Sequence, residues 1–95
     1  MRILTTIVIV DDEEEILTAL EQMLSGEGYV VKAFSSSKEA ESYLKTKTAD
    51  LAVFDIKMPE LDGFSLLKSV RVHRPSLPII FLSSKAEEQD QIIGF

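Results

Sequence analysis

Residues 5–10 read TTIVIV and are followed directly by Asp11 and Asp12. Two further stretches, LAVF at residues 51–54 and IIFL at residues 79–82, are also continuous apolar runs rather than alternations of apolar and polar residues. Continuous apolar runs of this length are typical of strands buried on both faces, as in a parallel sheet. We therefore predict a parallel sheet that contains these three runs.

A fourth strand and several helices complete the pattern. Residues 29–34 (YVVKAF) favour a strand, and Lys32 within it indicates an edge position. Apolar residues at helical spacing lie between the strands, and a further helical segment is expected over residues 86–93. The spaced residues are Ile16, Leu17, Leu20, Met23 and Leu24, then Ala40, Tyr43 and Leu44, then Phe64, Leu66, Leu67 and Val70.

Alternating strands and helices of this kind predict an α/β fold, a doubly wound parallel sheet with right-handed crossovers and helices on both faces. With 95 residues there is room for one small domain, so residues 1–95 are taken as a single domain. In such sheets ligands bind beyond the carboxyl ends of the strands. A functional site is expected there.

The polar residues that follow the apolar runs are Asp11, Asp12, Asp55 and Ser83. Three clustered carboxylates repel one another, so the cluster favours a bound cation, and hard oxygen ligands without histidine or cysteine select Mg²⁺. A carboxylate beside such an ion can attack a phosphoryl group and form an aspartyl phosphate. Asp55 is the expected nucleophile.

Charge and composition exclude several classes of protein. A formal net charge of −6 argues against direct binding of nucleic acid or of an anionic membrane by this domain. The longest nearly apolar run, residues 3–10, is too short to span a bilayer and does not resemble a signal peptide. The sequence has no cysteine, which excludes disulfides and thiolate metal sites. We expect a soluble cytoplasmic protein.

Three segments carry a resemblance to a known family: IVIVDDEE, LAVFDIKMPELDGFSLL and PIIFLSSK, in that order. Their order and spacing resemble the receiver domain of bacterial two-component response regulators, and together they cover nearly the whole chain. The resemblance implies a flavodoxin-like sheet with strand order 2-1-3-4 within this chain. It also implies a domain that accepts a phosphoryl group in a phosphorelay and is not a separate enzyme.

The resemblance further implies roles for individual residues. Asp55 would be the phosphoacceptor, Asp12 a direct Mg²⁺ ligand, Asp11 a ligand through water, and the backbone carbonyl of Lys57 a further ligand. Ser83 would be the switch hydroxyl that moves toward the phosphoryl oxygens.

The side chains of Lys57 and Lys85 would flank the site and influence how water reaches the acyl phosphate. The implied partners are a sensor histidine kinase or a histidine phosphotransfer protein, and an output domain or a downstream protein. The signal would reach these partners by switching a binding surface.

In the family, a fifth strand carries a lysine in a Lys-Pro motif and a switch aromatic, and a fifth helix follows. The sequence ends before them, so we interpret the domain as incomplete at its carboxyl terminus and expect it to accept phosphoryl groups poorly. Residues 79–82 would then be an open, apolar edge. We expect that edge to be completed by a longer polypeptide or by another chain, as in a homodimer or an exchanged-element dimer.

Simpler interpretations of the same residues remain. Asp12 with Glu15 could cap a helix, Asp55 could be a turn residue, and Ser83 could cap the next helix. His73, near a helix end, is interpreted as a solvated terminus rather than as a phosphoryl carrier.

Two other functional classes are open at this point. A Mg²⁺-dependent hydrolase of the haloacid dehalogenase type also uses a strand-end aspartate, but its Asp-x-Asp pattern would need an aspartate where Lys57 stands. The other class is a binding module that acts through its helix surfaces alone. A phosphate-analogue titration with Mg²⁺ separates it from a receiver.

Overall fold

A computed structural model of the chain describes residues 4–82 and 92–94. Strands and helices alternate in the order β1 (Thr6–Val10), α1 (Glu14–Gly26), β2 (Val30–Phe34), α2 (Ser37–Thr46), β3 (Leu51–Asp55), α3 (Gly63–His73), β4 (Ile79–Leu82) and β5 (Ile92–Gly94). One sheet has the order β2-β1-β3-β4-β5, and its first four strands are parallel. The predicted doubly wound α/β fold and the 2-1-3-4 order are confirmed.

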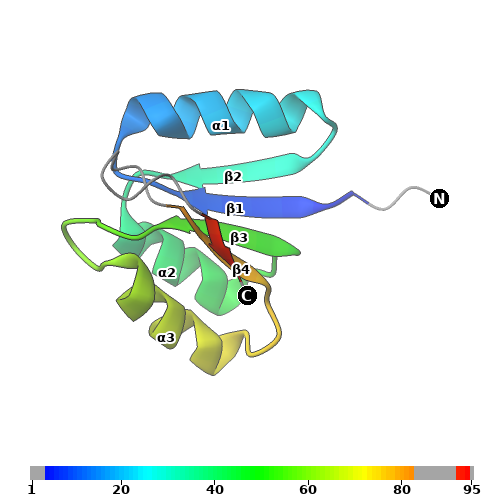
Figure 1. The fold of residues 1–95 in the computed structure, drawn as a ribbon. Coiled ribbons are helices and arrows are strands. Elements are labelled where there is room, and N and C mark those ends of the chain that lie inside the picture. The colour runs from blue at the N-terminus through cyan, green and yellow to red at the C-terminus, as the bar shows by residue number, and fades with distance from the viewer. Residues whose placement is uncertain (1–3, 83–91, 95) are drawn as a thin grey trace.

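The helices cover the two faces of the sheet unequally, with α1 on one face and α2 and α3 on the other (Figure 1). Alternate residues of β1 point to opposite faces. Val8 and Val10 belong to the larger buried cluster under α2 and α3, whereas Ile7 and Ile9 pack with Leu17 of α1. β1 is therefore buried on both sides, as its continuous apolar run predicts.

Local sequence signals set the ends of the helices. Gly28 has φ of 99°, a left-handed conformation that favours glycine, and its amide bonds the Ser25 carbonyl just after α1. Ser36 is the N-cap of α2, and its Oγ accepts a hydrogen bond from the Glu39 amide at 3.3 Å. Lys32 lies exposed on β2, at the edge of the sheet as predicted. None of the described helices is long and apolar enough to cross a membrane.

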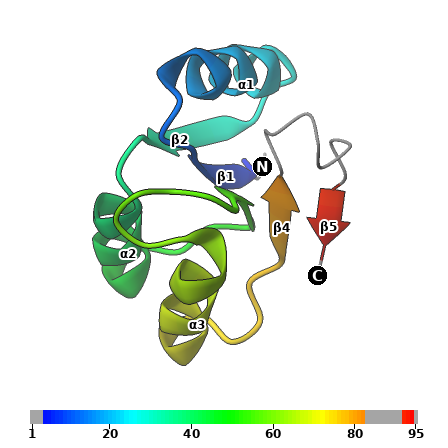
Figure 2. The ribbon, with the colours of Figure 1, turned by 60° about the vertical axis from the view of Figure 1, so that its left-hand side comes forward.

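The described carboxyl-terminal residues differ from the sequence prediction. Residues 92–94 form β5, which runs antiparallel beside β4 (Figure 2). In the register of this pair, Phe81 stands opposite Ile93. The helix predicted for residues 86–93 is therefore wrong at its last two positions, while residues 86–91 lie outside the described part of the chain. Two β-branched residues followed by glycine favour a strand over a helix.

The open edge predicted at β4 is also corrected, because β5 pairs with it. The unpaired N–H and C=O groups of an edge strand are a template for any nearby extended segment, which accounts for the pairing. β5 is antiparallel and three residues long, so it is not the parallel fifth strand that the resemblance implies. Across residues 4–82 and 92–94, no parallel strand lies beyond β4 and no helix follows α3.

Candidate functional site

Three aspartates meet at the carboxyl end of the sheet. β1 and β3 are parallel neighbours with Val10 opposite Phe54, so the residues that follow these positions emerge at the same edge. One carboxylate oxygen from each of Asp11, Asp12 and Asp55 lies within 4.8 Å of the others. The expectation that the strand ends bring these three side chains together is confirmed.

Two of the three carboxylates are buried. Asp11 and Asp55 are 2% and 3% exposed, whereas Asp12 is exposed. Oδ1 of Asp11 accepts a hydrogen bond from the Glu13 amide at 2.8 Å. Oδ2 of Asp11 is buried, and no group in the described part of the chain donates a hydrogen bond to it. Such an atom costs free energy unless a proton or a cation satisfies it.

Burial and mutual repulsion raise the pKa of both buried carboxyls. Desolvation is the largest cause for Asp55 and the charges of Asp11 and Asp12 add to it, so the pKa of Asp55 rises to about 6. Desolvation also raises the pKa of Asp11, although its hydrogen bond from Glu13 opposes the rise. When one of the two buried carboxyls is protonated, it can donate a hydrogen bond to the other.

These properties fit a magnesium ion. The cluster offers carboxylate oxygens, which hard divalent cations prefer, and the unsatisfied Oδ2 of Asp11 is a lone pair available for a ligand or its water. A divalent charge would also offset the repulsion that raises the pKa of Asp55. The residues present could therefore hold Mg²⁺. Lys57 lies two residues beyond β3 with an exposed side chain, and its carbonyl stays a predicted ligand.

The simpler interpretation of Asp12 as a helix cap is wrong. The N-cap of α1 is Glu13, and no side chain makes a capping hydrogen bond there. The capping aspartate of this end of the sheet is instead Asp62, whose Oδ1 accepts from the Ser65 amide at 2.8 Å at the start of α3. That hydrogen bond lowers the pKa of Asp62.

The sequence does not reveal that the turn before α3 lies in close contact with the site. A Cβ atom placed on Gly63 would lie 2.5 Å from the backbone oxygen of Asp55 and 3.1 Å from Cα of Ile56. The Gly63 amide donates to the Ile56 carbonyl at 2.8 Å. The Asp-Gly pair at residues 62–63 is the only local signal, and it predicts a turn without revealing the contact.

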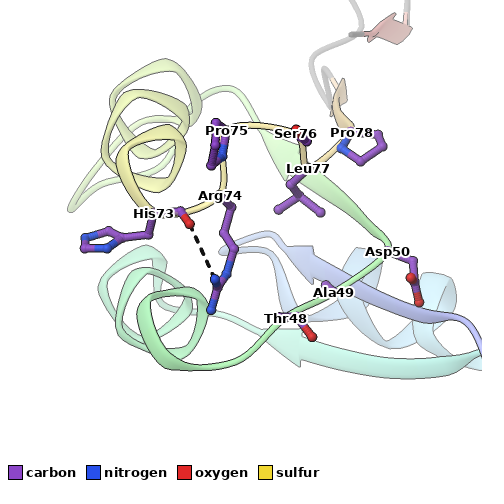
Figure 3. Close-up of a pocket in the computed structure, with 9 residues that line it drawn as sticks. All are labelled: Thr48, Ala49, Asp50, His73, Arg74, Pro75, Ser76, Leu77 and Pro78. Carbon is purple, nitrogen blue, oxygen red and sulfur yellow. Dashed lines mark hydrogen bonds between the residues drawn. The ribbon is translucent and has the colours of Figure 1, made fainter.

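The remaining candidate residues lie elsewhere. Ser83 and Lys85 are outside the described residues. His73 is exposed at the last position of α3, about 15 Å along the helix from Gly63 at 1.5 Å per residue. Figure 3 shows it beside a pocket at the opposite end of the sheet, where Arg74 extends toward the segment that carries Thr48. His73 is thus remote from the aspartates.

Comparisons with known proteins agree on one family. Residues 7–95 match the family model of the response regulator receiver domain. The chain is 39% identical over 88 residues to the regulatory protein VanRc of Enterococcus gallinarum, and 40% identical over 88 residues to the alkaline phosphatase synthesis transcriptional regulatory protein PhoP of Bacillus subtilis. Each alignment covers 93% of this chain but only 38% and 37% of the relative, so the chain spans less than two fifths of their lengths.

Solved structures give the same result. A response regulator receiver domain protein from Methanospirillum hungatei is similar with a TM-score of 0.84 and 34% identity, covering 87% of this chain and 66% of that one. The response regulator protein TrrA from Thermotoga maritima, solved in complex with Mg²⁺ and BeF, has a TM-score of 0.82 and 28% identity, covering 90% and 75%. These matches favour a receiver over the hydrolase alternative.

Proposed function

Because this chain belongs to the response regulator receiver domain family, we propose that Asp55 accepts a phosphoryl group and thereby switches a partner-binding surface. The observation that carries the proposal is the cluster of three carboxylates within 4.8 Å at the ends of β1 and β3. Asp55 is the member at the end of the central strand β3, between β1 and β4.

The proposed phosphoryl transfer depends on the ionisation of the Asp55 carboxyl. With a pKa of about 6, its carboxyl is ionised in most molecules at pH 7 and can act as a nucleophile. A carboxylate oxygen attacks the phosphorus of a phosphohistidine, a new P–O bond forms, and the P–N bond breaks. The imidazole nitrogen leaves with the electron pair and takes a proton from solvent. Burial of Asp55 excludes most water from the starting carboxylate.

The proposed Mg²⁺ ligands are Asp12 directly, Asp11 through water, Asp55, and the backbone carbonyl of Lys57. When bound, the ion would neutralise charge on the transferring phosphoryl oxygens. The buried, unsatisfied Oδ2 of Asp11 supports this assignment, because an ordered water on the ion could donate a hydrogen bond to it. The similar TrrA protein was solved in complex with Mg²⁺ and BeF, which supports a Mg²⁺ site in this chain as well.

Further parts of the proposal concern residues and partners beyond the described site. Ser83 is the proposed switch hydroxyl, and Lys57 and Lys85 flank the acyl phosphate. The phosphoryl donor is a sensor histidine kinase or a histidine phosphotransfer protein. The similarity to the transcriptional regulatory protein PhoP supports an output domain in the whole protein, because this chain spans less than two fifths of the length of PhoP.

Treatment with acetyl phosphate and Mg²⁺, followed by mass spectrometry, tests the proposal. We expect the mass of one phosphoryl group, at low yield, on the wild-type chain, mapped to Asp55, and none on Asp55→Asn. Chelation of Mg²⁺ should suppress the modification. Phosphate mapped to His73 or to a serine, with Asp55 unmodified, would refute the assignment.

A further inference from the structure

The loop of residues 56–62 connects β3 to α3 and carries Lys57, the proposed carbonyl ligand. One end of this loop is fixed by Gly63, whose amide donates to the Ile56 carbonyl at 2.8 Å. The middle is anchored by Met58, which is 8% exposed and packs in the larger core cluster. A side-chain hydrogen bond to Glu60 holds the remaining part of the loop.

Glu60 ties the loop to the beginning of α2. Its Oε1 accepts a hydrogen bond from Oγ of Ser36 at 2.8 Å and lies 3.5 Å from the amide of Lys38. Ser36 is the N-cap of α2, and the same Oγ accepts from the Glu39 amide. The Glu60 carboxylate therefore lies at a helix N-terminus, where unpaired amides and the helix dipole favour an anion.

We propose that Glu60 is a positioning residue that holds this loop against α2 and so presents the Lys57 carbonyl to a metal ion bound at Asp55. This inference rests on the proposed function. A loop that is already ordered pays less conformational entropy when its backbone oxygen becomes a ligand. Removal of the tether should thus appear as weaker Mg²⁺ binding rather than as general loss of structure.

Two substitutions at Glu60 distinguish the effect of its hydrogen bond with Ser36 on Mg²⁺ affinity from the effect of its negative charge. Glu60→Gln keeps an oxygen that can accept from Ser36 and removes the negative charge. Glu60→Ala removes both. If the hydrogen bond positions the loop, Glu60→Gln retains near wild-type Mg²⁺ affinity, because the effect of an exposed charge is screened by salt. If charge alone attracts the cation, both substitutions weaken binding equally.

The chain offers a matched control in Glu41. Ser69 donates to Oε2 of Glu41 and so joins α2 to α3, with the same pair of side-chain types as Ser36 and Glu60. Glu41→Ala removes one carboxylate–serine hydrogen bond and one negative charge from α2, but it leaves the loop of residues 56–62 tethered. Its Mg²⁺ affinity should equal that of wild type.

The test is a calorimetric titration with Mg²⁺ of wild type, Glu60→Ala, Glu60→Gln and Glu41→Ala, with Asp55→Asn in parallel. We expect Glu60→Ala to weaken Mg²⁺ binding about three- to tenfold, the range given by one hydrogen bond. Faster amide hydrogen exchange at Met58 in Glu60→Ala, but not in Glu41→Ala, should accompany it.

Unchanged affinity in Glu60→Ala, or equal weakening in Glu60→Gln and Glu60→Ala, would overturn the positioning role. Weakening in Glu41→Ala that matches Glu60→Ala would overturn it as well, since the effect would then not depend on the loop. Failure of the proposed function is seen separately, as wild-type Mg²⁺ affinity in Asp55→Asn.

Discussion

At the amino end of the sheet Asp50 and Thr6 exchange two hydrogen bonds, whereas at the carboxyl end Oδ2 of Asp11 is buried with no donor among the described residues. The Asp50 carboxylate accepts from the Thr6 amide at 2.8 Å, and the Asp50 amide donates to the Thr6 carbonyl at 2.8 Å. Both ends thus place an aspartate beside β1, but only one of them is satisfied by the chain itself.

Two arginine side chains donate hydrogen bonds to backbone carbonyls at the amino end of the sheet. Nη1 of Arg71 donates to the carbonyls of Arg74, Pro75 and Leu77 in the turn before β4. Arg74 donates to the Lys47 carbonyl from Nε at 3.2 Å and from Nη2 at 3.0 Å. The difference is that the chain satisfies its own polar groups at the amino end but leaves a buried carboxylate oxygen unsatisfied at the carboxyl end, where the proposed cation would bind.

The largest expected effect is a pH dependence at the carboxyl end. The folded pKa of Asp55 is raised from 3.8 to about 6, so the folded state binds this proton more tightly than the unfolded state. Without metal, its contribution to stability is fully present below pH 3.8 and is lost as the pH rises to about 6. At 1.36 kcal/mol per pKa unit, the loss is about 3 kcal/mol.

Urea unfolding in EDTA between pH 4 and pH 7 should measure this loss as a difference between wild type and Asp55→Asn. The variant lacks the titrating group, so its stability should fall less over the same range. Parallel curves for the two proteins would show that Asp55 is not destabilised by its surroundings.

Arg71→Ala should give the next largest effect, a loss of about 2 kcal/mol of unfolding free energy. The substitution leaves the carbonyls of the turn before β4 without their charged donor, and a hydrogen bond to a charged group contributes about 1.5 to 3 kcal/mol. Mg²⁺ affinity should not change, because the turn lies at the opposite end of the sheet. A calorimetric titration that showed weaker Mg²⁺ binding by Arg71→Ala would contradict the separation of the stabilising contacts at the amino end from the proposed metal site at the carboxyl end.

Gly63→Ala should cost about 1 to 2 kcal/mol. The added Cβ would lie 2.5 Å from the Asp55 backbone oxygen, and forced overpacking costs about 1 to 3 kcal/mol, partly offset by the better helix propensity of alanine. Unlike Arg71→Ala, this variant should also slow modification of Asp55 by acetyl phosphate. A stability loss with an unchanged modification rate would mean that the contact does not position Asp55.

Asp50→Ala should have the smallest effect, a loss of about 1 kcal/mol from one exposed hydrogen bond to the Thr6 amide. Asp50→Asn keeps an acceptor oxygen and should recover most of that loss. Thermal unfolding of both variants at one pH provides the measurement. Equal losses would indicate that the negative charge, rather than the hydrogen bond, holds the strand end.

Much of the acidic site could be predicted because its signals are local. Asp11 and Asp55 each come at the end of a continuous apolar run, and parallel strands bring such ends together. The order of the strands came from the resemblance to receiver domains, since apolar runs carry no information about which neighbours pair. Ser83 and Lys85 lie outside the described residues and remain predictions.

The errors and omissions arose where tertiary contacts decide. The strand at residues 92–94 depends on the free edge of β4, which the spacing of its own residues does not reveal. The hydrogen bond between Ser36 and Glu60 joins residues 24 positions apart, on a helix cap and a loop that meet only in the folded chain. The carbonyl partners of Arg71 and Arg74 lie in the turn before β4 and just after α2, so the sequence alone does not reveal either pairing.

The most direct test of the account is the stabilisation that Mg²⁺ provides to wild type and to Asp55→Asn at pH 7, measured by urea unfolding. At about one hundred times its dissociation constant, Mg²⁺ should stabilise wild type by about 2.7 kcal/mol and Asp55→Asn by much less, while metal-free Asp55→Asn should be the more stable of the two. Equal stabilisation of both proteins by Mg²⁺, or a metal-free Asp55→Asn that is less stable than wild type, would contradict a carboxyl end kept charged for a cation.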